Sequence, residues 1–339
     1  MKRPFLALAA LLTALALAAC TSRSQPMGPP TGPAVSTADA IYAIDGYRLP
    51  LYVWRPADEP RAVIIAVHGF DDYVRAFDRA GTQWAEDGII VYGYDQRGFG
   101  ATTDPGIWAG TDTLVADLIA VVRLVRLRHP DLPLVLVGES MGGAASMVAA
   151  VREADLPVDG LVLVAPAVWS TDLAPLYQRW GRAIGVALLP GLVVSGEGLD
   201  LVPTDNIEAL REMAADPLVL KENRLDTVDG LLTLMGEAYA IADQVSLPTL
   251  VLYGDNELIV PEAPIRSLVD QLRASGNPVT LAFYPDGYHM LLRDLNADIP
   301  IADIAAWTLD RAAPLPSGAD GRPPFWETED VPVGATSAR

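Results

Sequence analysis

The stretch LVLVGESMGGAASMVAAV, residues 134–151, decides the fold of this chain. Four apolar residues at its start predict a buried strand, and the alanine-rich run at its end predicts a helix. Between them, a serine framed by glycines occupies a sharp strand-to-helix turn, which lifts the hydroxyl of Ser140 above the edge of a sheet. Gly138 and Gly142 allow the two backbones to approach closely, because glycine has no Cβ. Ser140 is therefore a candidate nucleophile.

The bulk composition excludes several classes of protein. The 339 residues carry a net charge of −19, and such an acidic surface repels phosphate backbones, so we expect no nucleic-acid partner. A single cysteine excludes an intrachain disulfide, a C-x-x-C redox pair and a cysteine-rich zinc site. The three histidines, His68, His129 and His289, leave little room for a histidine metal site, and we expect no metal. Composition gives no information on the oligomeric state.

A basic start and an apolar run from Phe5 to Ala19 open the chain. The run is too short to span a membrane comfortably and has the shape of a secretory signal. Its end, Leu-Ala-Ala-Cys, resembles the bacterial lipobox and contains Cys20, the only cysteine. We expect a lipoprotein signal peptide over residues 1–19, with ordinary secretion through cleavage near Ala18 as the alternative.

Acylation of Cys20 determines where the protein is expected to lie. Each buried CH₂ of an acyl chain contributes about 0.8 kcal/mol, so more than one chain gives stable attachment to a membrane. The residue after the cysteine is Thr21 and not Asp. By resemblance to Gram-negative lipoproteins, the absence of Asp at this position favours the outer membrane. The expected location is the bacterial cell envelope, lipid-anchored through Cys20, on the periplasm-facing outer membrane.

Two segments lack apolar periodicity. Residues 20–39 are rich in Ser, Thr, Pro and Gly, which predicts a flexible tether between the lipid anchor and a globular body. Residues 312–339 have a similar composition, and we expect a disordered tail there.

The body of the chain alternates short apolar runs with longer helical patterns, which predicts an α/β fold with a mostly parallel sheet flanked by helices. Asp45-Gly46 lies between two strand patterns and predicts an opening antiparallel hairpin. Six candidate parallel strands follow, at residues 62–67, 89–94, 134–137, 161–164, 249–253 and 279–283.

The alternation stops after Ala167 and resumes near Pro248. The segment 168–247 is rich in large apolar residues, and we expect it to form a helical cap. The cap would be inserted after the strand at residues 161–164, the sixth strand when the two hairpin strands are counted. Such a cap would cover the carboxyl ends of the strands, where open α/β sheets bind ligands. An ordinary helical excursion on the surface is the alternative. The expected core therefore consists of residues 40–167 and 248–311.

A serine nucleophile requires a base, and the base requires an acid that orients it. His289, in the loop after the last strand, is the candidate base. His129 stands at a predicted helix end, and His68 precedes a glycine in another loop. The order in this type of fold is Ser, acid, His, with the acid after the penultimate strand. The loop there offers Asp255 and Glu257, and Asp172 is a remote third candidate.

Acyl chemistry at Ser140 also needs hydrogen-bond donors for the developing oxyanion, each contributing roughly a hundred- to a thousandfold in rate. One expected donor is the backbone amide of Met141, the residue after the nucleophile. The other comes from the loop after the strand at residues 62–67, the third strand when the two hairpin strands are counted. This loop begins His68-Gly69-Phe70. The amide of Phe70 is the expected donor, with Gly69 allowing a close approach of the backbone, and His68 is expected to be structural.

With these residues in place, the chain resembles the α/β-hydrolase superfamily, and within it the monoacylglycerol lipase and lysophospholipase-like group of serine aminopeptidase-type hydrolases. The resemblance spans about residues 40 to 311. The motifs that carry it are His68-Gly-Phe70, Asp95-Gln-Arg-Gly-Phe-Gly100, Gly138-x-Ser-Met-Gly-Gly143, Ala165-Pro-Ala167 and Tyr288-His-Met-Leu-Leu292.

The resemblance implies a serine carboxylic ester hydrolase that acts on lipid-like esters, of the monoacylglycerol or lysophospholipid type, through an acyl-enzyme on Ser140 and without a metal or organic cofactor. It places Glu257 on the position of the acid, with Asp255 as the fallback. Two residues depart from the family pattern: Glu139 stands where relatives often carry histidine, and Glu257 replaces the usual aspartate.

Two other functions are compatible with the same scaffold. A thioesterase, an acyltransferase or a peptidase could be built on it, because the fold does not determine the reaction. A non-catalytic lipid-binding lipoprotein is the second alternative, and it would be expected to lack one of Ser140, the acid and His289.

Overall fold

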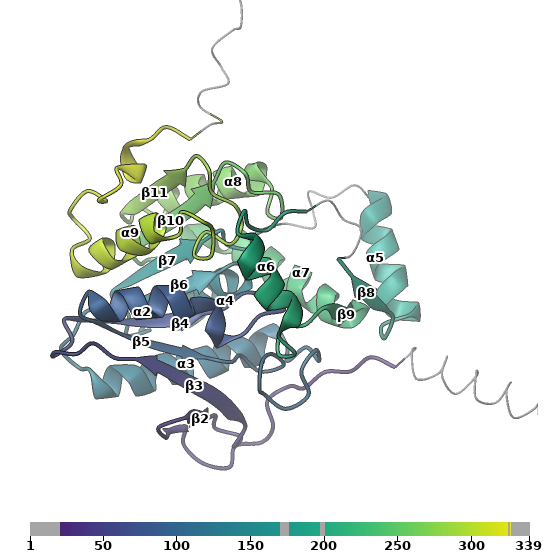
Figure 1. Ribbon diagram of the computed structural model, residues 1–339. Helices are drawn as coiled ribbons and strands as arrows, with labels where there is room; N and C mark the ends of the chain where they lie inside the picture. The colour runs from purple at the N-terminus through teal and green to yellow at the C-terminus, as the bar shows by residue number, and fades with distance from the viewer. Residues whose placement is uncertain (1–20, 170–175, 197–200, 325, 327–339) are drawn as a thin grey trace, which may run out of the picture.

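The structure is a computed structural model that describes residues 21–169, 176–196, 201–324 and 326. A nine-stranded sheet in the order β1-β2-β3-β5-β4-β6-β7-β10-β11 forms the centre of the molecule (Figure 1). Its strands are β1 (Val35–Ser36), β2 (Ala40–Tyr42), β3 (Arg48–Trp54), β4 (Ala62–Val67), β5 (Ile89–Tyr94), β6 (Leu134–Glu139), β7 (Gly160–Val164), β10 (Thr249–Gly254) and β11 (Val279–Tyr284). The pairs β1-β2, β2-β3 and β3-β5 are antiparallel, and all the other neighbouring pairs of this sheet, from β5-β4 to β10-β11, are parallel.

The sequence predictions for the core are confirmed. The α/β fold has its mostly parallel sheet and flanking helices, Asp45-Gly46 joins the antiparallel strands β2 and β3, and all six candidate parallel strands are present. The helices of the core are α2 (Asp78–Glu86), α3 (Thr111–Arg128), α4 (Met141–Arg152), α7 (Leu225–Ala240), α8 (Glu262–Ala274) and α9 (Asp298–Leu309).

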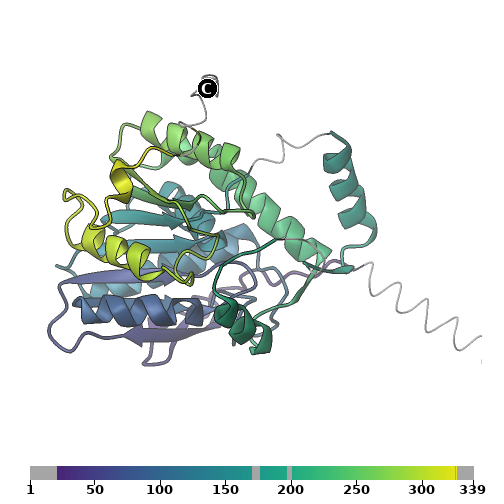
Figure 2. The same ribbon diagram turned by 45° about the horizontal axis from the view of Figure 1, so that its top comes forward.

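Two hydrophobic layers sandwich the sheet, and the alternation of side chains along each strand supplies both. In β4, Val63 and Ile65 pack with α3, α4, α7 and α8, whereas Ile64 and Ala66 face α2 and α9. Figures 1 and 2 show these two groups of helices on opposite faces of the sheet. Every residue of β4, β5 and β6 is buried, as expected for parallel strands covered on both faces.

The segment expected as a cap divides into two parts. Its described elements are α5 (Leu176–Leu188), β8 (Val193–Ser195), α6 (Ile207–Ala215), β9 (Glu222–Arg224), α7 and the short 3-10 helix η3 (Ala242–Gln244). Leu234 and Ala238 of α7 are fully buried in the same hydrophobic cluster as α3 and α4, so α7 packs as a core helix and not as part of a cap. Figure 2 shows α5 standing apart from the sheet, on the far side of α7.

The amino-terminal segment differs from the expected flexible tether. Residues 21–39 lie along the body: the amide of Gln25 donates to the carbonyl of Trp108 at 3.0 Å, and the amide of Met27 donates to Oγ1 of Thr113 at 3.0 Å. β1 then joins the edge of the sheet. The polar composition suggested disorder, but it gives no information on whether the amides of such a segment find acceptors elsewhere.

The carboxyl-terminal segment also differs from expectation over its first part. Leu315 and Ala319 are buried against α9, and the carboxylate of Asp303 accepts from the amide of Ser317 at 3.0 Å. Residues 312–324 are therefore packed on the core. Residues 327–339, the leader 1–19 and Cys20 lie outside the described residues. Among the described residues, no helix has both the length and the apolar character needed to cross a membrane.

Candidate active site

Ser140 occupies the sharp turn between β6 and α4. Its backbone has φ 51° and ψ −116°, a conformation that is rare and strained for a residue with a Cβ. The turn is held because the amide of Ser140 donates to the carbonyl of Val164 at 2.9 Å, and its carbonyl accepts from the amide of Gly143 at 3.0 Å. This backbone conformation holds Ser140 directly after β6, where the residue lines a cavity.

The glycines beside Ser140 permit this turn because other backbone atoms occupy the space of a side chain. A Cβ on Gly142 would lie 2.0 Å from the carbonyl oxygen of Val67, and a Cβ on Gly138 would lie 2.5 Å from the carbonyl oxygen of Gly142. Neither backbone can yield without moving β4 or β6. The sequence assigned both glycines to this role, and the distances give the physical reason.

Gly142→Ala is therefore expected to destabilise the fold by roughly 3 kcal/mol or more, at the upper end for overpacking a core. Urea unfolding followed by circular dichroism measures this change. Gly32→Ala is the matched control, because a Cβ there meets nothing within 4 Å. A Gly142→Ala variant as stable as the Gly32→Ala variant would contradict the packing argument.

An imidazole and a carboxylate from two loops pair beside the serine. Nδ1 of His289, after β11, lies 2.6 Å from Oε2 of Glu257, after β10, and both side chains are buried. The other oxygen of Glu257 accepts from the amides of Ile259 at 2.6 Å and Val260 at 3.0 Å. Because an acceptor oxygen of Glu257 faces Nδ1 of His289, this contact requires the tautomer in which Nδ1 donates, and Nε2 is then free to accept a proton.

The competing acids are not at this position. Asp255 directly follows β10 and is largely exposed; partial loss of water around its carboxylate, together with the neighbouring Asp286, raises its pKa. Within the described part of the chain, no hydrogen bond joins Asp255 to His289. Asp172 lies outside the described residues. The structure thus brings Glu257, and not Asp255, to the imidazole.

Ser140 and His289 line one cavity of about 450 Å³ at the carboxyl ends of the strands. No hydrogen bond joins the Ser140 hydroxyl to the His289 ring among the described side chains. Such contacts are often long in a site without substrate and tighten when substrate binds. Apolar side chains from the inserted segment and from the acid loop cover the two residues: Leu201, Met213, Leu231, Met235, Ile259 and Val260.

Two backbone amides close to the serine in the chain or in space have no protein acceptor among the described residues. A Cβ built on Gly69 would meet the Ser140 side chain at 3.4 Å, so this loop passes directly beside the hydroxyl. Over the described residues, the amides of Phe70 and Met141 donate no hydrogen bond. Both amides are therefore available to a ligand oxygen.

His68 supports the loop that carries Phe70. Its ring is fully buried, Nδ1 lies 2.8 Å from the carbonyl oxygen of Gly69, and Nε2 accepts from the amide of Gln96 at 3.0 Å. Burial lowers the pKa of His68, which favours the neutral ring that these two contacts require. His129 hydrogen-bonds the hydroxyl of Tyr92 at 2.9 Å, on another part of the fold. Among the three histidines, only His289 reaches the cavity.

A buried charge cluster, Asp72, Glu139 and Arg293, borders the cavity, and the sequence analysis missed it as a unit. Nη2 of Arg293 lies 2.5 Å from Asp72 and 3.6 Å from Glu139. Burial raises the pKa of Glu139, and the charge of Arg293 acts in the opposite direction. Only Glu139 was noted from the sequence, as a departure from the family pattern. No motif connects these three positions.

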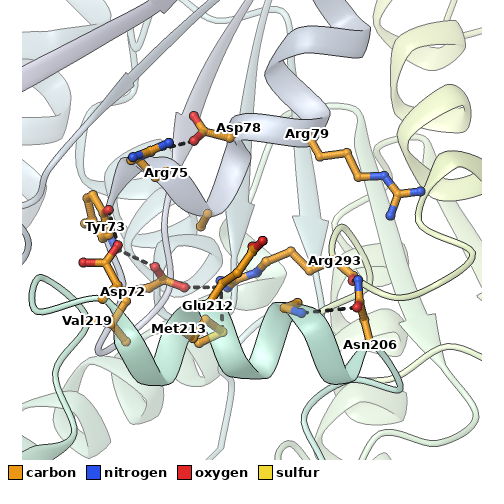
Figure 3. A pocket seen from close by; sticks show the side chains of 13 residues that line it. Asp72, Tyr73, Arg75, Asp78, Arg79, Asn206, Glu212, Met213, Val219 and Arg293 are labelled. Atoms are coloured by element: carbon orange, nitrogen blue, oxygen red, sulfur yellow. Dashed lines mark hydrogen bonds and ion pairs between the residues drawn. The ribbon is translucent and has the colours of Figure 1, made fainter.

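The same cluster separates the serine cavity from a second one. Asp72, Met213, Val219 and Arg293 line both, and the second cavity also has a volume of about 450 Å³. Figure 3 shows it between α6 and the start of α2, with charged side chains on its walls. The serine cavity is therefore lined mainly by apolar side chains on its outer wall and by fixed charges at this boundary.

Asp71 follows Phe70 and has a positive φ of 67°. Both of its carboxylate oxygens accept from Nδ2 of Asn223, at 2.8 and 2.9 Å. Burial raises the pKa of Asp71 to about 7. The folded protein thus binds a proton here that the unfolded chain releases at lower pH, and this group makes stability fall as pH rises from about 4 to about 7.

Asp71→Asn is expected to remove this fall in stability with pH. The free energy of unfolding of the variant should therefore rise relative to that of the parent between pH 5 and pH 8. Asparagine tolerates positive φ as aspartate does and keeps a carbonyl that accepts from Asn223. Urea unfolding at the two pH values measures the difference. Asp131→Asn, at an exposed position, is the control. Parallel profiles for the parent and Asp71→Asn would contradict the assignment.

The serine turn, the imidazole–carboxylate pair and the mostly parallel sheet together define an α/β-hydrolase fold with the elements of a serine hydrolase site. The chain belongs to the family described as serine aminopeptidase, S33, whose model matches residues 58–296. That match covers well over half of the chain and includes Phe70, Ser140, Glu257 and His289.

Two individual proteins that are similar to this chain are named as lipases of monoacylglycerols or monoglycerides. The chain is 27% identical over 267 residues to a monoacylglycerol lipase of Mycolicibacterium smegmatis, covering 78% of this chain and 94% of that protein. It is 25% identical over 280 residues to the monoglyceride lipase of Mus musculus, covering 81% of this chain and 91% of the mouse protein.

Among solved structures, a soluble variant of monoglyceride lipase from Saccharomyces cerevisiae, in complex with a substrate analogue, matches with a TM-score of 0.66 at 18% identity. The match covers 84% of this chain and 99% of that one. The Paleococcus ferrophilus monoacylglycerol lipase matches with a TM-score of 0.63 at 21% identity, over 77% of this chain and 98% of that one. These likenesses support the α/β-hydrolase fold.

Proposed function

We propose that this protein hydrolyses lipid-like carboxylic esters, of the monoacylglycerol or lysophospholipid type, through an acyl-enzyme on Ser140. The observation that carries the proposal is the pairing of His289 with Glu257 at the cavity that the strained Ser140 also lines. Each of the three groups alone is common in proteins. Their meeting at one cavity, from three distant segments, is what a serine hydrolase requires.

In the proposed reaction, the Ser140 oxygen bonds to the ester carbonyl carbon while Nε2 of His289 takes the hydroxyl proton. Glu257 stabilises the imidazolium through its contact with Nδ1, and the amides of Phe70 and Met141 donate to the carbonyl oxygen as it becomes an anion. The imidazolium then gives its proton to the leaving alcohol. Water, deprotonated by His289, releases the acyl group as a carboxylic acid and restores Ser140.

The lining of the cavity favours an acyl chain as the group that is transferred. Apolar side chains from α6, α7 and the acid loop surround the serine, and such walls gain free energy by removing a hydrocarbon from water. Two of the relatives are named as monoacylglycerol or monoglyceride lipases, which agrees with this chemistry.

A substrate panel tests the proposal. Residues 21–339 contain the whole described body, and this protein is expected to hydrolyse p-nitrophenyl esters and monoacylglycerols or lysophospholipids faster than it cleaves acyl-CoA or peptides. Faster cleavage of a thioester or an amide would transfer the assignment to the corresponding alternative. Transfer of the acyl group to an added alcohol in preference to water would favour an acyltransferase.

We also propose that the protein is a lipoprotein of the bacterial envelope, anchored through acylated Cys20 and facing the periplasm from the outer membrane. The support is the lipobox-like end of the leader and the position of the only cysteine. Cys20→Ser is expected to move the protein from the membrane fraction to the soluble fraction, because the acyl chains can no longer be attached. Fractionation of cells that produce each form measures this, and unchanged fractionation would contradict acylation at Cys20.

A further inference from the structure

Strand β9 of the inserted segment reaches the loop that carries the Phe70 amide, residues 70–74, which we call the oxyanion loop. The amide of Leu220, two residues before β9, donates to the carbonyl of Asp71 at 2.8 Å. Nδ2 of Asn223, within β9, donates to both carboxylate oxygens of Asp71, at 2.8 and 2.9 Å. Asp71 directly follows Phe70. The inserted segment therefore holds the chain next to this amide by its backbone and by its side chain.

A third contact extends this attachment along the oxyanion loop. The hydroxyl of Tyr73 donates to the carboxylate of Asp216 at 2.5 Å, and Val219 packs in one hydrophobic cluster with Tyr73 and Val74. Residues 216–224 of the inserted segment thus run beside the oxyanion loop and are joined to it along their whole length. A movement of this part of the insertion would move the loop with it.

The backbone of Asp71 explains why the oxyanion loop needs this support. Its φ of 67° lies in the left-handed region, which is unfavourable for a residue with a Cβ and persists only where the surroundings hold it. Asp71 and Phe70 share a peptide unit. Release of Asp71 from the left-handed region would therefore turn the chain at Phe70, and the Phe70 amide would leave the neighbourhood of Ser140.

The side chain of Asn223 makes its polar contacts with Asp71. Asn223 is 8% exposed, and within the described part of the chain its Oδ1 is buried without a hydrogen-bond partner. A buried acceptor without a partner costs about 1–3 kcal/mol, so an amide is a poor choice if the position needs only packing. What this amide supplies is the pair of contacts from Nδ2 to Asp71.

Strand β9 is itself held on its other side by the amino-terminal segment. The guanidinium of Arg224, the last residue of β9, donates to the carbonyl of Thr21 at 3.0 Å. The amide of Arg23 donates to Asp226, in the first turn of α7, at 3.0 Å. The first described residues of the chain therefore cross the point where β9 continues into α7, and they restrain it.

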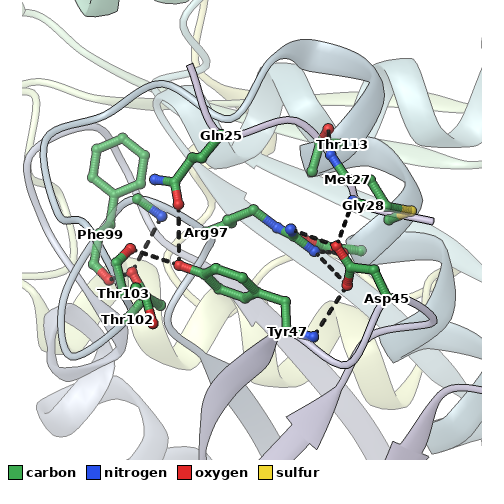
Figure 4. A network of polar contacts seen from close by, with 12 residues as sticks. Gln25, Met27, Gly28, Asp45, Tyr47, Arg97, Phe99, Thr102, Thr103 and Thr113 are labelled. Carbon is green, nitrogen blue, oxygen red and sulfur yellow. Dashed lines mark hydrogen bonds and ion pairs between the residues drawn. The ribbon is translucent and has the colours of Figure 1, made fainter. Parts of the chain in front are cut away.

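The same amino-terminal segment is anchored to the core by a buried ion pair. The amide of Gly28 donates to Asp45 at 2.9 Å, and Asp45 pairs with the buried guanidinium of Arg97 at 2.8 Å. The Gln25 side chain donates to the carbonyl of Ile107 at 2.6 Å. Figure 4 shows this network around the segment. β9 therefore connects an anchored part of the core to the oxyanion loop.

We propose that Asn223 is a positioning residue: from the inserted segment it holds Asp71, so that the Phe70 amide stays directed at the oxyanion that develops on the ester carbonyl. The insertion then does more than cover the cavity, because its position decides whether the oxyanion donor is in place. This inference rests on the proposed function, since the donor matters only if a carbonyl oxygen becomes an anion there.

Asn223→Ala tests this role. At about pH 8.5, above the pKa of about 7 that burial gives Asp71, kcat for a soluble ester is expected to fall between about tenfold and a hundredfold, with KM within about twofold. A misplaced donor weakens the transition state and not the bound substrate. Asn277→Ala is the matched control and should keep both constants. Its Nδ2 also donates to a neighbour, Ser275 at 3.1 Å, but it lies before β11, whereas His289 follows that strand.

A tetrahedral inhibitor separates positioning from general damage. An alkyl boronic acid bonds to the Ser140 oxygen and places one of its own oxygens where the oxyanion would lie, whereas a fatty alcohol of the same length only fills the cavity. Asn223→Ala should bind the boronic acid more weakly, by about the factor by which kcat falls, and should bind the alcohol as the parent does. A merely structural defect would weaken both ligands or neither.

Exchange of the two side chains provides a rescue. In the double variant Asp71→Asn, Asn223→Asp, the amide on residue 71 donates to the carboxylate on residue 223, and asparagine tolerates the positive φ. Its kcat should return to within about fivefold of the parent. The double variant Asp71→Asn, Asn223→Ala lacks the contact but leaves no unpaired carboxylate, so it reports the same loss of kcat if Asn223→Ala does not fold. Urea unfolding shows which variants are folded.

The outcomes are distinct. Unchanged kcat in the folded variants that lack the contact, no recovery in the exchanged pair, or equal weakening of the boronic acid and the alcohol would each overturn the inference and leave the proposed function intact. A parent protein that neither hydrolyses esters nor binds the boronic acid would contradict the proposed function, and the positioning role with it. A loss of kcat that the exchanged pair restores supports the inference.

Discussion

Ser140→Ala is expected to lower kcat for ester hydrolysis by about 10⁶-fold and to abolish labelling by a fluorophosphonate probe. The substitution removes the hydroxyl oxygen that forms the acyl-enzyme in the proposed reaction, and losses of this size accompany removal of the nucleophile from a serine hydrolase. The variant keeps the turn, because alanine at φ 51° introduces no side chain larger than serine. Gel-based labelling and a p-nitrophenyl ester assay measure the two effects.

The residual activity of this variant carries further information. The amides of Phe70 and Met141 and the apolar cavity remain, so a rate above that of water is expected to persist. Labelling that survives Ser140→Ala would show another reactive residue and would contradict the enzyme assignment. A parent protein that is not labelled at all would favour the non-catalytic, lipid-binding alternative.

Local patterns explain why much of the fold and site could be predicted from the sequence. The turn at Ser140 needs a strand, two glycines and a helix within one continuous stretch, and all of them are visible in residues 134–151. His289 could be selected because the chain has only three histidines. Glu257 was placed by resemblance to relatives, and the contacts with the Ile259 and Val260 amides explain how the loop accommodates its longer side chain.

The features that the sequence did not reveal depend on distant contacts. Asp72, Glu139 and Arg293 belong to three separate segments, and each looks like an ordinary surface charge until the fold buries them together. Residues 21–39 have the composition of a linker, yet their amides find acceptors at Trp108, Thr113 and Asp45, which no local pattern indicates.

A similar reason applies to the helix α7. The sequence assigned its apolar residues to a cap. Periodicity shows that a helix has a buried face, but it does not show which surface covers that face. In the structure, Leu234 and Ala238 meet α4 and the core. Helix α5 of the same insertion instead leaves large apolar side chains exposed, so one segment contains both a core helix and an exposed one.

Glu257→Gln is expected to lower kcat by about 10⁴-fold, the second largest effect, with little change in KM. Glutamine preserves the shape of the side chain and can still accept hydrogen bonds from the amides of Ile259 and Val260. It loses the negative charge that stabilises the imidazolium of His289, and an amide nitrogen facing Nδ1 would favour the tautomer in which Nε2 carries the proton. That tautomer cannot take the proton of Ser140.

Asp255→Asn is the matched control for this experiment, because it removes a carboxylate from the same loop without touching His289. We expect it to retain activity within about threefold of the parent, since surface substitutions away from a site seldom alter its geometry. Steady-state kinetics with a soluble ester gives kcat and KM for both variants. If Asp255→Asn lost more activity than Glu257→Gln, the acid role would pass to Asp255, and the loop would have to rearrange in the working enzyme to bring that carboxylate to the imidazole.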